Sequence, residues 1–197
     1  YAKGWSLPVV QDDIHKKPQW LTPAVNRLAD DIMLEINKSA ALNGMALVSL
    51  CLLASKTMTM SQTEMEHAIS DYLTLFRTLP FSDTMSIPEY NASELITNTL
   101  SLKRLQTETD QFGTLISPQP DNAVALTYYR NNIIHLFALP SLITALVFAK
   151  NGCEKSFILT TVKTIYPLLH KELFIYFTVD EALTYADKCI SQLKAQG

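Results

Sequence analysis

The sequence predicts a mainly α protein, a multi-helix bundle with one small β-hairpin inside a winged-helix-like unit. Three observations support this fold class. The 197 residues include only 5 glycines and 9 prolines, which leaves few breaks and favours long helices. Apolar residues recur at the three-and-four spacing of amphipathic helices, and strand-like runs are confined to a short stretch after residue 111. The length suits one large domain or two small ones.

The first predicted helix follows an irregular segment. Residues 1–21 have no sustained period, so we expect a linker or arm from a preceding domain, with a helical C-terminal domain over residues 22–197. Thr22 and Pro23 suit the N-cap and the first helical position. The apolar stripe of this helix consists of Val25, Leu28, Ile32 and Ile36. The spacing predicts an amphipathic helix that covers something with this stripe.

The next elements resemble a winged helix in their order. Residues 40–54 are apolar nearly all round, so this helix belongs inside the protein. Ser61 and Glu64 form a capping-box pattern that begins the next helix, and Asn91 or Ser93 begins a third, which we expect to end near Thr107. Strand-like runs at 112–117 and 123–126 enclose a turn-rich connector. We therefore predict a winged-helix-like part over about residues 58–126.

The charge pattern argues against nucleic acid as a partner of this unit. The whole chain has a formal net charge of -3. Between residues 92 and 130 the charges are mixed: Lys103, Arg104 and Arg130 against Glu94, Glu108, Asp110 and Asp121. A binding face for phosphates needs clustered Lys and Arg. We expect the wing to be architectural.

The remaining helices follow a long apolar segment over residues 127–150. Pro140 lies inside it and should kink the helix or end it near Leu139. Residues 156–173 have helical spacing, and residues 173–177 form an apolar run that needs a partner. Thr178 or Asp180 suits the N-cap of a last helix over residues 181–195.

Polar side chains are concentrated at the start of this central segment, at Tyr128, Arg130, Asn131, Asn132 and His135. Tyr128, Asn131 and His135 would share one face of a continuous helix. One interpretation is a binding cluster at a cleft or domain interface. The other is an internal network in which Arg130 pairs with a carboxylate and Asn132 bonds a loop carbonyl. The residues alone are consistent with either arrangement.

The common active-site, metal and membrane patterns are missing from the sequence. No glycine-rich phosphate loop or Gly-x-Ser-x-Gly motif occurs. Cys51, Cys153 and Cys189 lack metal-ligand spacing, so we expect no metal or cofactor and read them as reduced, buried thiols. No apolar run reaches the roughly 20 residues of a spanning helix. We expect a soluble chain, or one seated at most on a membrane surface.

Several blocks of the sequence, all in register, resemble the bacterial membrane-associated glycerol-3-phosphate acyltransferases. They are PQWLTPAVN at 18–26, LLAS at 52–55, ASELI at 92–96, TYYRNNIIH at 127–135 with LPSL at 139–142, and YPLLHKELF at 166–174. The blocks keep their order from about residue 18 to the end of the chain. Together they are far more specific than any one of them.

The resemblance implies transfer of a fatty acyl group from acyl-CoA or acyl carrier protein to the 1-hydroxyl of sn-glycerol 3-phosphate, the first step of phospholipid synthesis. In that family a histidine followed five residues later by an aspartate activates the hydroxyl, and a glycine-centred acidic motif with an arginine holds the phosphate. Both motifs lie upstream of the residue 18–26 block and are absent here. The resemblance therefore implies no catalytic residue in this chain.

Two hypotheses follow. In the first, the chain is the helical C-terminal portion of such an enzyme, inactive alone, and serves as a scaffold or interface for the acyltransferase domain. Its substrates would bind through that domain, and the parent protein would sit peripherally on the cytoplasmic face of the inner membrane. In the second, the chain is a free-standing all-α interaction module with a winged-helix core.

Overall fold

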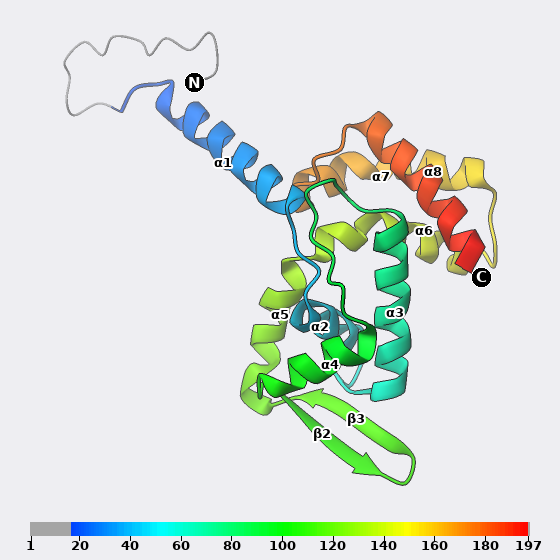
Figure 1. Cartoon of the computed structure of the whole chain (residues 1–197). Helices are drawn as coiled ribbons and strands as arrows, with labels where there is room; N and C mark the ends of the chain where they lie inside the picture. The colour runs from blue at the N-terminus through cyan, green and yellow to red at the C-terminus, as the bar shows by residue number, and fades with distance from the viewer. Residues whose placement is uncertain (1–16, 197) are drawn as a thin grey trace.

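The computed structural model describes residues 17–196, and its fold is mainly α, as the sequence predicts (Figure 1). The elements are α1 (Leu21–Lys38), α2 (Gly44–Ala54), β1 (Met60–Ser61), α3 (Gln62–Thr78), α4 (Ala92–Ser101), β2 (Leu105–Asp110), β3 (Gly113–Pro118), a 3-10 turn (Pro120–Asn122), α5 (Ala123–Asn131), α6 (Ile134–Ala149), α7 (Lys155–Leu173) and α8 (Val179–Gln196). Most of the predicted linker over residues 1–21 lies outside the described residues.

Figure 1 separates the chain into a lower part with α2, α4, α5 and the sheet, and an upper part with α6, α7 and α8. The long helix α3 runs between them and packs against α2, α4 and α8. One continuous hydrophobic core extends through both parts. Helix α1 is the exception, because it projects from the upper part and has no buried residue.

The lower part has the element order of a winged helix: α2, β1, α3, α4, β2 and β3. The three strands form an antiparallel sheet in the order β1-β3-β2, with Met60 opposite Ile116 and Leu105 opposite Pro118. The unit spans residues 44–118, so it begins and ends earlier than the expected range of 58–126. Its first helix, α2, is the segment that the sequence places inside, and its residues Leu47, Val48 and Leu52 are fully buried.

The hairpin is present and its strand β3 confirms the run predicted at residues 112–117, but its other strand differs from the prediction. The strand predicted at residues 123–126 is wrong, because these residues are the first turn of α5. The third helix ends at Ser101 instead of near Thr107, and β2 follows. A two-residue loop joins the strands: Asp110 Oδ1 accepts the Phe112 N–H at 2.8 Å, and Gly113 has a φ of 136°. This conformation suits glycine and closes the hairpin earlier than expected.

Side-chain caps mark the starts of α2, α3, α4 and α8. Ser61 and Asn91 each form a capping box with the glutamate three residues later, as the sequence predicts for Ser61. Thr178 does the same with Glu181 at the start of α8. The prediction for Thr22 is wrong, because α1 starts at Leu21 with Trp20 at the N-cap and no side-chain cap bond.

The apolar run over residues 173–177 is covered by this chain itself. Ile175 and Phe177 are buried, and the Phe177 ring lies 5.0 Å from that of Phe81 and 5.1 Å from that of Tyr185, between centroids. Among residues 17–196 no single helix is long and apolar enough to span a membrane. The residues 120–131 and α6 reach that length and composition only as a pair bent by 81°.

Candidate functional site

The central segment is broken where the sequence predicts a continuous helix. Helix α5 ends at Asn131 and α6 begins at Ile134, after a bend of 81°. Ile133 has non-helical dihedral angles at this break and its side chain is completely buried. Tyr128, Asn131 and His135 therefore do not share one helix face, and that prediction is wrong. Helix α6 instead continues past Pro140, so an end near Leu139 is also wrong.

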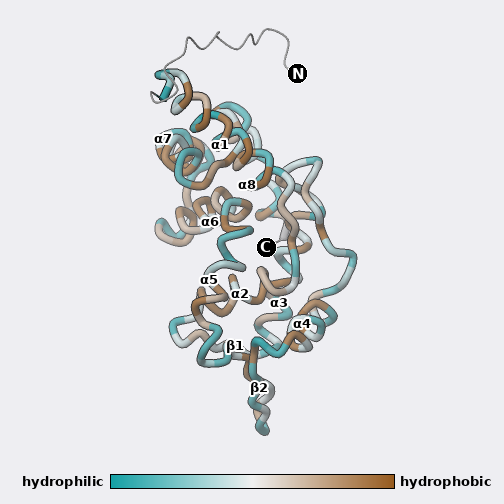
Figure 2. The backbone as a smooth tube through the Cα atoms, turned by 90° about the vertical axis from the view of Figure 1, so that its left-hand side faces the viewer, coloured by the Kyte–Doolittle hydropathy of each residue, from teal (hydrophilic) through white to brown (hydrophobic). Residues whose placement is uncertain are grey.

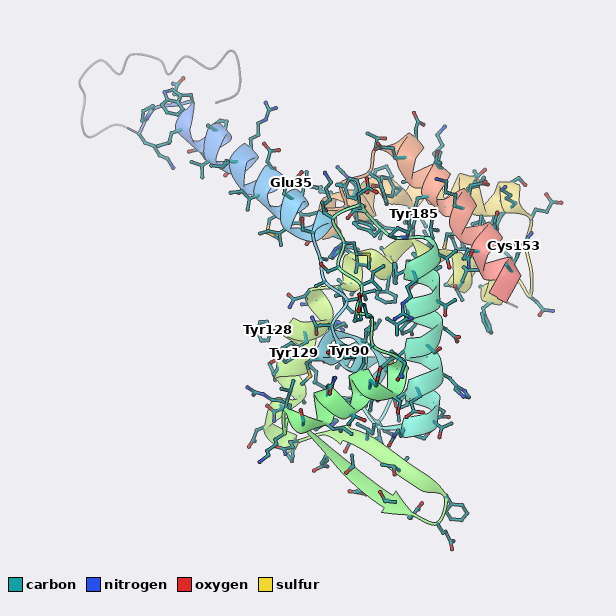
Figure 3. The ribbon with its side chains drawn as sticks, viewed as in Figure 1. Glu35, Tyr90, Tyr128, Tyr129, Cys153 and Tyr185 are labelled. Atoms are coloured by element: carbon teal, nitrogen blue, oxygen red, sulfur yellow. The ribbon has the colours of Figure 1, made fainter. Side chains whose placement is uncertain are left out.

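The polar residues before the break lie at the surface. Tyr128 is 71% exposed and lies on the outer side of α5 (Figure 3). Asn131 and Asn132 are exposed and Arg130 is half-buried. The guanidinium of Arg130 donates to Asn131 Oδ1 at 2.9 Å from Nη2 and 3.3 Å from Nε. Within residues 17–196 it pairs with no carboxylate, and the Asn132 side chain makes no hydrogen bond, so the predicted internal network is wrong for both.

His135 is separated from this group and points into the core. Its side chain is buried, and Nε2 lies 2.9 Å from the carbonyl oxygen of Asn37. That nitrogen therefore carries the proton and donates. The ring packs edge-on against Phe81, with 5.4 Å between centroids. Burial lowers the pKa of His135 below its ordinary value, while the bond to Asn37 opposes this shift. The internal-network interpretation thus holds for His135 alone.

Asn37, at the end of α1, is the residue that sequence reasoning missed. Its side-chain amide donates to the carbonyl oxygen of Leu173 at 2.8 Å and to that of Phe174 at 3.2 Å. Phe174 caps α7 in the left-handed conformation, with a φ of 48°. An asparagine near a helix end is ordinary, and nothing in the sequence indicates partners 98 and 136 positions away.

The next carbonyl of α1 is held as well. Ser82 and Thr84, from the loop between α3 and α4, donate their hydroxyls to the carbonyl oxygen of Lys38. The last carbonyls of a helix lack partners within the helix, so these bonds satisfy groups that would otherwise need water. Together with the bonds of Asn37, these bonds attach the C-terminal end of α1 to α6, to α7 and to the loop between α3 and α4. We call Asn37, Lys38, Ser82 and His135 with their partners the α1 anchor.

The described residues contain no recognisable catalytic arrangement. His170 Nδ1 lies 2.6 Å from the carbonyl oxygen of Ile175, which it bonds, so this histidine also supports the backbone. Among residues 17–196 no three His, Cys, Asp or Glu side chains gather as metal ligands. An open depression is lined by Tyr90, Ser93, Glu94, Thr97 and Asn98. The Glu94 carboxylate there already accepts the Asn91 N–H at 2.8 Å.

The winged-helix-like unit is also poorly suited to phosphate contacts. In DNA-binding relatives of this architecture, a helix and the wing carry basic residues to the backbone. Here α4 and both strands of the hairpin contain no Lys or Arg, and β2 carries Glu108 and Asp110. Two of its helices pack closely: a Cβ on Gly44 of α2 would lie 2.9 Å from the Leu95 carbonyl oxygen of α4.

Comparison with known proteins gives a single family. The C-terminal region of glycerol-3-phosphate acyltransferase matches residues 2–197. A glycerol-3-phosphate acyltransferase of Alteromonas mediterranea is 55% identical over 182 residues, which are 92% of this chain and 22% of the relative. Another from Pseudoalteromonas atlantica is 52% identical over 90% of this chain and 22% of its own length. A relative from Shewanella halifaxensis is 40% identical over 97% of this chain and 24% of its own length.

The chain thus spans about a quarter of the length of the curated relatives it matches. No solved structure matches it. The family model covers all the described residues, including the α1 anchor and the surface residues of α5. The chain therefore belongs to the glycerol-3-phosphate acyltransferase family, in which it corresponds to the C-terminal region.

Proposed function

We propose that this chain is the supporting C-terminal portion of an enzyme that acylates the 1-hydroxyl of sn-glycerol 3-phosphate. The donor is acyl-CoA or acyl carrier protein, and the product is 1-acyl-glycerol 3-phosphate. The relatives named for this activity support the reaction. The acyltransferase domain of the same protein binds the substrates and performs the transfer, and this chain forms an interface with it.

The observation that carries a supporting role is the use of the polar groups of the central segment. His135 bonds the backbone of α1, whereas Tyr128, Arg130, Asn131 and Asn132 are at least partly open to a partner. The Arg130 guanidinium has donors to spare, because its bonds within the described chain go to the single acceptor Asn131 Oδ1. Tyr and Arg are enriched at protein interfaces, so we assign these α5 residues to the contact with the acyltransferase domain.

Acyl transfer by the full-length protein tests this role. Transfer from acyl-CoA to labelled glycerol 3-phosphate should be absent with this chain alone. In the full-length enzyme Arg130→Ala should lower activity while leaving the thermal stability of this chain unchanged, because its bond to Asn131 is local. Lys163→Ala is the matched control, since it removes one exposed positive charge from α7. Turnover by the chain alone, or full activity of Arg130→Ala, would contradict the assignment.

We also propose that the full-length protein is peripheral at the cytoplasmic face of the inner membrane. The product of the reaction carries a long acyl chain, and burial of each CH₂ in a membrane is favourable by about 0.8 kcal/mol. An enzyme that releases it at a bilayer surface avoids moving it through water. Membrane fractionation should sediment the full-length protein, and an alkaline wash should release it. Retention after the wash would indicate integral insertion instead.

A further inference from the structure

Helix α1 exposes the apolar stripe that the sequence predicts to be covered. Val25, Leu28, Ile32 and Ile36 are 49–58% exposed, and Met33 beside them is 38% exposed. We call these five residues the α1 stripe. Scattered apolar side chains at a surface need no explanation. A stripe with the spacing of one helix face is different, because an amphipathic helix is stable chiefly through the surface that its apolar face buries.

The stripe faces away from the rest of the described chain. Residues two positions apart on an α-helix point in roughly opposite directions, about 200° apart. Leu34 and Lys38 are half-buried, whereas Ile32 and Ile36, two positions before each, are exposed. The Lys38 ammonium lies 5.6 Å from the centroid of the Tyr176 ring. Helix α1 thus meets the body of the protein near its C-terminal end, with the side that carries Leu34 and Lys38, and Figure 2 shows hydrophobic residues recurring along its length.

The α1 anchor holds this helix in a defined direction. The carbonyl oxygens of Asn37 and Lys38 and the Asn37 amide all bond to other elements. A helix fixed at one end loses less conformational freedom when its other surface is covered. Helix α1 projects from the rest of the chain in Figure 1, so the α1 stripe is exposed in a defined orientation before any partner binds it.

We propose that the α1 stripe docks into an apolar groove on the acyltransferase portion of the same polypeptide. This proposal rests on the function proposed above and names the second surface of that interface. The matched family is a C-terminal region, and the aligned residues make up only 22–24% of the relatives. Most of each relative therefore lies outside the matched region and is available to cover α1.

The charges of α1 favour a protein occupant over a lipid surface. Asp30, Asp31 and Glu35 outnumber Arg27 and Lys38. Helices that lie on anionic membranes carry Lys and Arg on their polar face, so this helix would be repelled. A groove bordered by Lys or Arg complements the stripe and its acidic margins.

Photo-crosslinking in the full-length protein tests this placement. Benzoylphenylalanine is introduced at Leu28 or Ile32 in the stripe, and at Arg27 or Asp31 on the polar side as matched controls. After irradiation in native membranes, peptide mass spectrometry should find the stripe positions joined to the acyltransferase portion of the same polypeptide. The control positions should give a several-fold lower yield of such products. Adducts with lipid, adducts between two copies, or equal yields at stripe and control positions would each overturn the proposal.

A second measurement separates this inference from the function on which it rests. Ile32→Asp in the full-length protein should reduce acyl transfer severalfold, and Asp31→Asn should not. If the stripe positions crosslink but Arg130→Ala leaves acyl transfer unchanged, the docking of α1 is supported and the assignment of the α5 residues to the interface is rejected. If Arg130→Ala reduces acyl transfer but the stripe positions do not crosslink, the supporting role of the chain is retained and the docking of α1 is rejected.

Discussion

Nε2 of His135 lies 2.9 Å from the carbonyl oxygen of Asn37, and this hydrogen bond joins the start of α6 to the end of α1. Asn37 in turn donates to the last carbonyls of α7. Three helices that are far apart in the sequence therefore meet at two side chains. The His135 side chain is buried and the bond is part-buried, so the imidazole cannot exchange this bond for water without cost.

The first prediction concerns the stability of this junction. His135→Ala should lower the free energy of unfolding by about 2 kcal/mol, because it removes the imidazole donor from the Asn37 carbonyl, which keeps a 3.3 Å bond from the Ala40 N–H, and opens a gap beside Phe81. Urea unfolding of the chain measures this. His135→Gln can still donate from its amide and should cost less. Asn132→Ala, at an exposed position, should stay within about 0.5 kcal/mol; equal losses in all three variants would contradict the assignment.

The second prediction concerns pH. Burial lowers the pKa of His135 in the folded chain below the ordinary value of 6.5. The unfolded chain therefore binds a proton near pH 6.5, whereas the folded chain binds it only at lower pH. The free energy of unfolding should be unaffected by this group above pH 6.5 and should fall as the pH decreases from there towards the folded pKa.

Chemical unfolding at several pH values between about 5 and 7.5 checks this direction, since glutamate and aspartate titrate lower. His135→Gln does not titrate and should flatten this part of the profile. A profile of the same slope in wild type and His135→Gln would show that another group is responsible.

The third prediction concerns the contact between α2 and α4. A Cβ at Gly44 would lie 2.9 Å from the Leu95 carbonyl oxygen and 2.6 Å from Thr99 Oγ1. Thr99 can rotate only by losing its own 2.7 Å bond to Leu95. Gly44→Ala should destabilise the chain by about 1–3 kcal/mol, despite the better helix propensity of alanine. Thermal unfolding measures the change, and a higher Tm would disprove the close approach.

The fourth prediction concerns the thiols. Cys51 and Cys189 are buried, and burial raises their pKa to about 12 and about 11, respectively. Cys153 is only half-buried. Because the thiolate is the reactive form, a disulfide reagent should label Cys153 rapidly in the folded chain and the other two only after unfolding. Cys153→Ser should remove the rapid phase, and its persistence would contradict this order.

Short-range patterns in the sequence were enough to place several elements. The capping boxes at Ser61 and Asn91 form within four residues, so the local sequence determines where α3 and α4 begin. The all-round apolar residues of α2 can only be accommodated inside, where the structure has them. The blocks at residues 127–135 and 166–174 indicate the family that the comparison confirms.

Other predictions failed where two local signals competed. Ala123 to Leu126 are compatible with either a strand or a helix, and Pro120 just before them starts helical structure instead of ending a hairpin. Leu105 to Asp110 pair with β3 through long-range backbone bonds that periodicity does not report. Of the five candidate residues, four lie together before the break and His135 lies apart; their role at an interface stays a prediction.

By itself the sequence determined the helical character, most capping sites, the buried α2 and the family. Only the tertiary structure decided that the central segment turns at Ile133, that His135 bonds Asn37, and that the stripe of α1 remains uncovered within residues 17–196. The physical reason is the separation along the sequence over which each interaction acts. Capping and periodicity act within one or two helical turns, whereas the partner of a buried imidazole and the side of a helix that is covered depend on how distant segments pack.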